Sequence, residues 1–208
     1  MLPDVIVFDI ETIPRQLDEK MQMLLKYKLR NLPNNEEKEV KATQHRFLDP
    51  CYAEIKAIGV LTTDAEEVSE IVIMGPEEYI ITSFFDTIAN SQNLFVSFNG
   101  FGFDIPFILS KAMLYGIKPT NARFCNLIRY RNSPHFDIMQ VFSSWGVFKP
   151  NLRELSNLFG VGDSKDILED KTTVEFLKTA SDEEIAEYCM GDVRVTYELF
   201  KKIYPVVS

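Results

Sequence analysis

Apolar residues form short runs through the first half of the chain. The runs at residues 5–8, 56–61, 68–74 and 94–98 are rich in β-branched or aromatic side chains and end near polar or glycine residues. Short apolar runs of this kind are typical of buried strands. Residues 64–66, between the second and third runs, predict a hairpin turn. The pattern therefore predicts three or four strands before mid-chain.

Helical patterns alternate with the last of these strands and then dominate the second half. We expect helices at residues 77–90, 105–115, 137–145, 151–159, 173–179 and 182–203. The last is the clearest, because Ser181 and Glu184 have the spacing of a capping box. Strands followed by alternating elements and then helices indicate an α/β protein with a mixed sheet flanked by helices.

The region between Thr12 and Cys51 departs from this pattern, because it is too long for a plain loop. We expect a helix at residues 17–29, followed by a polar turn around Asn34 and Glu36. The favoured interpretation is a surface excursion, and the alternative is a lid over a substrate. The whole chain, residues 1–208, is expected to be one domain with this insert at about 15–50.

The composition fits an ordinary globular domain of 208 residues, with 46% hydrophobic residues. Three cysteines without a CxxC pair, and only two histidines, argue against a structural zinc site. The N-terminal apolar run is interrupted by Asp9, so it does not resemble a signal peptide, and no run is long enough for a transmembrane helix. We therefore expect a reduced, cytoplasmic protein without a membrane partner.

The net charge of −9 argues against a protein that coats nucleic acid by bulk electrostatics. Binding of a polyanion would need a local basic surface. Residues 105–136 contain no Asp or Glu but include several basic residues, namely Lys111, Lys118, Arg123, Arg129 and Arg131. The alternative is a solvated face. We expect Arg129 and Arg131 to share one strand-like face and to be the contacting pair.

Two carboxylates end the first apolar run. Asp9 and Glu11 are two residues apart, so in an extended strand both side chains point to the same face and can reach one metal ion. An Asp-x-Glu after a strand is also common as a turn or a cap. The pair therefore needs support from elsewhere in the chain.

Two later segments supply candidate partners. The segment FNGFGFDIPFI carries Asn99 and places Asp104 where a strand meets a helix, although Asp104 could instead cap that helix. The segment EIAEYCMGDV carries Tyr188 and Asp192 four residues apart, on one helix face. Taken alone, a buried tyrosine beside an aspartate is more often structural.

Together these segments resemble the DEDD exonucleases, in the branch with a tyrosine in the third motif. This branch includes the proofreading domains of family-B DNA polymerases and stand-alone, polymerase-B-like 3′-5′ exonucleases. The similarity extends over residues 5–203 through FDIET, FNGFGFDIP, HFDIMQVF, NLRELSNLFG and YCMGDV. Only the insert matches loosely.

The resemblance implies a ribonuclease H-like fold and a two-metal site. By this likeness Asp9, Glu11 and Asp192 hold one divalent ion, Asp9 bridges to a second, and Asp104 supports the second through water. Tyr188 orients the attacking water, where the other branch of the family has a histidine. Oxygen ligands suit Mg²⁺ or Mn²⁺, which would also neutralise the crowded carboxylates.

The expected reaction is removal of nucleotides from the 3′ end of nucleic acid. We expect single-stranded or frayed DNA, with a polymerase or DNA repair partner possible. An RNA exonuclease of the same fold is one alternative, and a catalytically idle nucleic-acid-binding module is another. Candidate substrate contacts are Asn99, Phe101, Phe103, Arg129, Arg131 and Lys165.

Overall fold

A computed structural model describes residues 2–33, 36–65, 67–162 and 172–208. Its strands form one mixed sheet in the order β3-β2-β1-β4-β5. Strand β2 pairs antiparallel with both β1 and β3, whereas β1 with β4 and β4 with β5 are parallel. The strands are β1 (Val5–Pro14), β2 (Ala53–Asp64), β3 (Glu67–Met74), β4 (Leu94–Ser97) and β5 (His135–Asp137).

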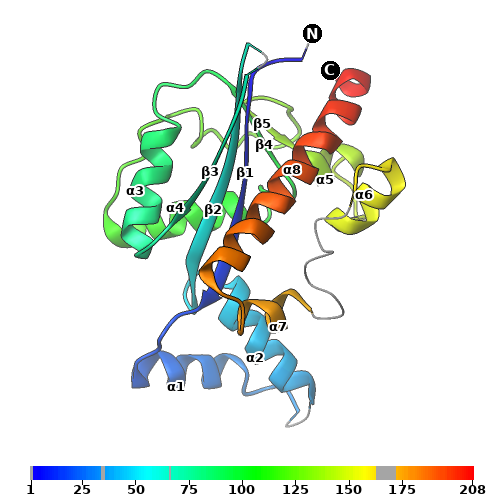
Figure 1. Cartoon of the computed structure of the whole chain (residues 1–208). Helices are drawn as coiled ribbons and strands as arrows, with labels where there is room; N and C mark the ends of the chain where they lie inside the picture. The colour runs from blue at the N-terminus through cyan, green and yellow to red at the C-terminus, as the bar shows by residue number, and fades with distance from the viewer. Residues whose placement is uncertain (1, 34–35, 66, 163–171) are drawn as a thin grey trace.

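Helices cover both faces of this sheet, which confirms the expected α/β, ribonuclease H-like architecture. Helices α3 (Glu77–Thr87) and α4 (Asp104–Tyr115) pack on one face, and α8 (Asp182–Val207) crosses the other (Figure 1). The shorter helices are α1 (Glu19–Lys28), α2 (Glu36–Leu48), α5 (Ile138–Phe142), α6 (Leu152–Phe159) and α7 (Thr173–Leu177). Within the described ranges, we find no helix with the length and apolarity needed to span a bilayer.

Strand β1 divides the core in two. Ile6, Phe8 and Ile10 belong to the cluster that includes α3 and α4. Val5 and Val7, which alternate with them, belong to the cluster formed with α8. Successive strand side chains point to opposite faces, so this alternation decides which later residues of β1 face α8.

Strand β1 is longer than expected and continues past Phe8 to Pro14. It is held there by antiparallel pairing with β2, which was also predicted too short. Asp9 and Glu11 therefore lie inside the strand and not beyond its end. The predicted hairpin is confirmed by the pairing of Asp64 with Glu67, although Glu66 itself lies outside the described residues. The short strand β5 was not predicted.

The predicted helices of the second half are present, with small differences at their ends. The Ser181 hydroxyl accepts the Glu184 amide, and the Glu184 carboxylate accepts the Ser181 amide, which confirms the capping box. Asn151 and Glu154 form a second box before α6. Each pair stabilises a helix start by satisfying backbone donors that would otherwise have no partner.

The insert contains two helices, of which only α1 was expected. Asn34, the expected turn residue, lies outside the described residues, and Glu36 begins α2. Helix α2 was not predicted because its sequence is polar. Phe47 is its single buried residue. The Thr12 hydroxyl donates to the Phe47 carbonyl over 2.6 Å. The last turn of α2 is thus packed against β1, whereas most of the described side chains of the insert are exposed, as expected for a surface excursion.

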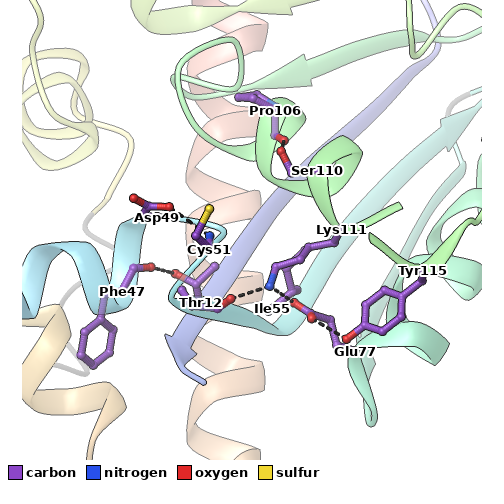
Figure 2. A network of polar contacts seen from close by, with 11 residues as sticks. Thr12, Phe47, Asp49, Cys51, Ile55, Glu77, Pro106, Ser110, Lys111 and Tyr115 are labelled. Atoms are coloured by element: carbon purple, nitrogen blue, oxygen red, sulfur yellow. Dashed lines mark hydrogen bonds and ion pairs between the residues drawn. The ribbon is translucent and has the colours of Figure 1, made fainter. Parts of the chain in front are cut away.

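A buried ion pair joins α4 to α3 on the face of the sheet opposite α8 (Figure 2). Lys111 is 1% exposed, and its Nζ lies 3.2 Å from Glu77 Oε1 while also donating to the Ala53 carbonyl. Glu77 also accepts the Ile55 amide and the Tyr115 hydroxyl. Burial lowers the pKa of Lys111 and Glu77 opposes that effect. Lys111 therefore cannot be part of a basic surface.

We predict that Lys111→Met lowers the free energy of unfolding by about 3 to 5 kcal/mol, because the buried Glu77 carboxylate loses its cation. Urea unfolding measures this change. The matched double variant, Lys111→Met with Glu77→Gln, should lose clearly less, since neither charge remains. A single variant within about 0.5 kcal/mol of the wild type would contradict the pairing.

Candidate active site

The candidate site lies part-way along β1, on the face of the sheet that packs against α8. Figure 1 shows α8 crossing this face. Asp9 and Glu11 continue the alternation of Val5 and Val7, so both carboxylates face α8. Glu11 is 6% exposed. Carboxylate oxygens of Asp9 and Glu11 and the Cys189 sulfur lie within 4.8 Å of one another. The first half of the expected site is thus assembled by the register of one strand.

Helix α8 approaches the strands unusually closely at Gly59, the β2 residue that pairs with Asp9. A Cβ at Gly59 would lie 2.9 Å from Val193 Cγ2 and 3.1 Å from Cys189 Sγ. Real Cβ atoms are almost never found at the first of these distances. A side chain at this position would hold α8 away from Asp9.

Helix α8 supplies the second pair. Tyr188 and Asp192 are one turn apart and buried, at 2% and 8% exposure. Burial, followed by the charges of Asp192 and Glu11, raises the pKa of Tyr188. Its hydroxyl lies 3.3 Å from the Thr173 hydroxyl of α7, and the Phe176 ring packs at 5.3 Å. Tyr188 is therefore a neutral phenol held beside the carboxylates.

Asp104 reaches the same region from the opposite layer. It begins α4, but Phe103 is the N-cap residue, so the alternative of a simple helix cap is wrong. The Asp104 Oδ1 accepts the Ile10 amide of β1 at 3.1 Å. Burial, with smaller contributions from Asp137 and Asp192, raises the pKa of Asp104 to about 7. Asp104 is therefore tied to β1 at Ile10, the residue between Asp9 and Glu11.

The loop between β4 and α4 is held by Asp137, a buried residue at the end of β5. Its carboxylate accepts the amides of Asn99 and Phe101, each at 3.0 Å, and caps α5 by accepting the Gln140 amide. Asn99 has a left-handed φ of 62°, and its carbonyl accepts the amides of the next turn. Asn99 therefore forms the turn that leads to Asp104.

The two aromatic candidates in this loop differ in their surroundings. Phe103 packs beside Phe107 against the α3 and α4 core. Phe101 lies between His135 and Trp145, with ring centroids 5.7 and 5.3 Å away. Packing into the core is the role that the structure supports for Phe103, whereas Phe101 borders the surface near the site.

The prediction that Arg129 and Arg131 share one strand-like face is wrong. Residues 126–134 form no strand, and Tyr130 between the two arginines has a left-handed φ of 64°. Arg129 lines a hollow with Phe101 and Gly102, and Arg131 lines a different hollow near the N-terminal ends of β1 and β4. Both side chains are exposed. Lys165 lies outside the described residues.

The donor set suits a hard divalent cation. Carboxylates supply the oxygen ligands that Mg²⁺ and Mn²⁺ prefer. Burial is the largest cause of the raised pKa of Asp104, and the charges of Asp137 and Asp192 raise it further. Burial, followed by Asp9 and Glu11, raises the pKa of Cys189 well above its usual value, which keeps the thiol protonated. The residues present therefore fit oxygen coordination better than thiolate coordination.

One known protein family matches most of the chain. Residues 45–206 match the family described as predicted 3′-5′ exonucleases related to the exonuclease domain of PolB. The chain belongs to this family. The matched region includes Asp104, Tyr188 and Asp192, and it starts in the last turn of α2. As a member of this family, the chain is assigned to the nuclease class of hydrolases, which act on nucleic acid.

A similar protein extends the likeness to the first strand. A DNA polymerase of Pyrococcus glycovorans is 23% identical over 213 residues, and the alignment covers 96% of this chain. That alignment covers 27% of the polymerase, so the chain spans about a quarter of this relative's length.

Two features of the site were missed or misread in the sequence. Gly59 and Cys189 were not identified as site residues from the sequence. His135 was not singled out either; it is buried, and its Nε2 lies 2.8 Å from the Phe124 carbonyl. Only the pairing of β1 with β2 could have pointed to Gly59, because it sets that residue opposite Asp9.

We predict that Gly59→Ala lowers the free energy of unfolding by about 1 to 3 kcal/mol, because the new methyl group overlaps Val193. Urea unfolding of Gly59→Ala, Val193→Ala and the double variant forms a double-mutant cycle. The double variant should lose less stability than the sum of the two single changes. If the losses of unfolding free energy were strictly additive, the added methyl group at residue 59 would not contact Val193.

Proposed function

We propose that this protein is a divalent-metal-dependent 3′-5′ exonuclease with Asp9, Glu11, Asp104, Tyr188 and Asp192 as its catalytic residues. The observation that supports this most strongly is the gathering of these side chains. They come from β1, α4 and α8, which are distant in sequence. Asp9 and Glu11 lie beside Cys189 of α8, and Asp104 accepts the amide of Ile10, the residue between them. A single buried carboxylate has many structural explanations, but four in one place need a common counter-charge.

Asp9, Glu11 and Asp192 would hold the metal, and Asp104 would act from the α4 side. Two divalent ions, Mg²⁺ or Mn²⁺, would lower the pKa of water and stabilise negative charge on the phosphate oxygens. The hydrogen bond from the Ile10 amide fixes the orientation of the Asp104 carboxylate. The packing of α8 over Gly59 sets the distance between Asp192 and Asp9.

Tyr188 would orient the attacking water. Its phenol stays protonated and can donate to, or accept from, a water beside the carboxylates. Water adds to the phosphorus of the last phosphodiester, the bond to the O3′ of the preceding nucleotide breaks, and a nucleoside 5′-monophosphate leaves. Thr173 and Phe176 hold the ring in place for this task.

Single-stranded or frayed DNA is the proposed substrate. The likeness to a DNA polymerase and to a PolB-related family supports DNA over RNA. Tyr188 is compatible with either polymer, and a contact to the 2′-hydroxyl would be the discriminator. The retention of all five polar side chains in one site disfavours a catalytically idle binding module. A cytoplasmic location and a polymerase or repair partner remain part of the proposal.

We predict that the protein shortens 3′-end-fluorescent or 5′-labelled single-stranded DNA in Mg²⁺ or Mn²⁺ and not in excess chelator. A matched RNA oligonucleotide should be cut more slowly. Asp9→Asn and Asp192→Asn should abolish turnover, whereas Glu183→Ala, which changes an exposed acid on the same helix, should keep the wild-type rate. Full activity in chelator, or near wild-type rates for either Asn variant, would overturn the assignment.

The same variants allow metal binding to be measured apart from turnover. Mn²⁺ should raise the thermal unfolding midpoint of the wild type, because a ligand bound only to the folded state stabilises it by about 2.7 kcal/mol at a hundredfold excess over Kd. Asp9→Asn should start from a higher midpoint without metal, since it relieves repulsion, and should respond less to Mn²⁺. An equal response would place the metal elsewhere.

A separate prediction concerns Tyr188. We expect Tyr188→Phe to lower the rate at saturating substrate by about 10- to 1,000-fold, the scale of a lost positioning group. Its Mn²⁺-induced shift of the unfolding midpoint should equal that of the wild type. Loss of that shift would make Tyr188 an organiser of the metal ligands and not a group that acts on water.

A further inference from the structure

Three aromatic rings form a cluster beside the candidate active site, which we call the aromatic platform: Phe101, Tyr130 and Trp145. The ring centroids of Phe101 and Trp145 are 5.3 Å apart, and those of Tyr130 and Trp145 are 5.1 Å apart. Phe101 is three residues before Asp104, and its amide is held by Asp137. The platform therefore starts in the turn that leads to Asp104, one of the proposed catalytic residues.

The outer ring of the platform is open to solvent. Tyr130 is 74% exposed, and Trp145 is half-buried between Tyr130 and Phe101. A residue used only to fill a core would be covered. An exposed tyrosine resting on a tryptophan instead offers a flat, polarisable face to an incoming planar group.

The backbone of the segments that carry Tyr130 and Trp145 is in an unfavourable conformation. Tyr130, Ser144 and Trp145 all have left-handed φ values, of 64°, 50° and 58°. Such values in residues other than glycine cost energy and persist where surrounding contacts impose them, often at ligand-binding positions. Here the Trp145 amide donates to the Gln140 carbonyl at 2.8 Å, which ties the strained turn to α5.

The surroundings of the platform are basic, in contrast to the chain as a whole. Asp137 is the only acidic residue between Asp104 and Glu154, and it is buried. Exposed Arg129 and Lys149 line the hollow that Phe101 and Trp145 also line. In a protein of net charge −9, this is a local surface that can attract a polyanion.

Tyr130 joins this hollow to a second one. It lines both, and the second is also lined by Arg123 and exposed Arg131, with Asp4 as the acidic side chain on its rim. Arg129 and Arg131 thus line different hollows, and Tyr130 borders both. The order from the active site outward is Phe101, Trp145, Tyr130 and then Arg131.

We propose that this path binds the single strand on the 5′ side of the nucleotide being removed, with unpaired bases stacked on Tyr130 and Trp145 and phosphates contacting Arg129, Lys149 and Arg131. The proposal rests on the proposed exonuclease function. It specifies the substrate further, as a strand with several unpaired nucleotides. Stacking does not depend on base identity, so strands of any sequence bind alike. A paired base presents only its edge and cannot stack on the platform.

The sole tryptophan of the chain allows a direct test, because all indole fluorescence reports on Trp145. Oligodeoxythymidine is titrated into the wild-type protein in chelator, so that the strand is not consumed. We expect quenching of the indole emission by this strand. An abasic oligonucleotide of equal length carries the same phosphates without bases, and it should bind more weakly and leave the emission unchanged.

Variants separate stacking from charge. Tyr130→Ala should weaken binding of dye-labelled oligodeoxythymidine by about 5- to 150-fold, the range for one stacked base. Tyr79→Ala, which removes an exposed tyrosine on α3, should bind as the wild type does. Arg129→Gln with Lys149→Gln should reduce the slope of log affinity against log salt by about 1.4, the value for two contacts to a single strand.

These experiments distinguish failure of the aromatic platform from failure of the proposed exonuclease function. Equal quenching by the abasic strand, or equal affinity of Tyr130→Ala with an unchanged unfolding midpoint, would overturn the platform even in an active nuclease. Base-dependent quenching by a protein that hydrolyses nothing in Mg²⁺ or Mn²⁺ would support the platform and overturn the nuclease assignment.

Discussion

Helix α8 lies so close to strands β1 and β2 at Gly59 that a single methyl group there would overlap it. This contact sets the position of Asp192 and Tyr188 relative to Asp9 and Glu11, and the hydrogen bond from the Ile10 amide to Asp104 adds the fourth carboxylate from the opposite layer. The arrangement places like charges together in a buried site, which opposes folding unless protons or cations compensate them. The raised pKa of Asp104, in which burial is the largest cause, reflects that cost.

The sequence predicts the fold well where local patterns and global packing agree. The alternation along β1 and the capping box of α8 identify the two elements that carry most of the site. The extension of β1 beyond Phe8 was not predictable from an apolar run, because Asp9 and Glu11 interrupt it and pairing with β2 sustains it. Helix α2 was missed for a related reason: its residues are polar, and only Phe47 reaches the core.

The sequence predicts which residue types form the candidate site and their order along the chain. It does not predict how these residues are arranged in space. Two-residue spacing on a strand and four-residue spacing on a helix are local, so both pairs could be read directly. That Asp104 would bond to β1 and not cap its own helix depends on how α4 sits across the sheet. The positive φ of Tyr130 likewise separates Arg129 from Arg131, and no periodicity indicates that turn. Long-range placement of this kind is decided by tertiary packing.

The proposed hydrolysis requires divalent metal bound by Asp9, Glu11 and Asp192. Anomalous diffraction from crystals of the wild-type protein soaked in Mn²⁺ tests this binding. We predict anomalous density coordinated by these three carboxylates, and loss of that density in Asp9→Asn crystals treated alike. Absence of density at these three carboxylates under saturating Mn²⁺, or density confined to other surface acids, would contradict it.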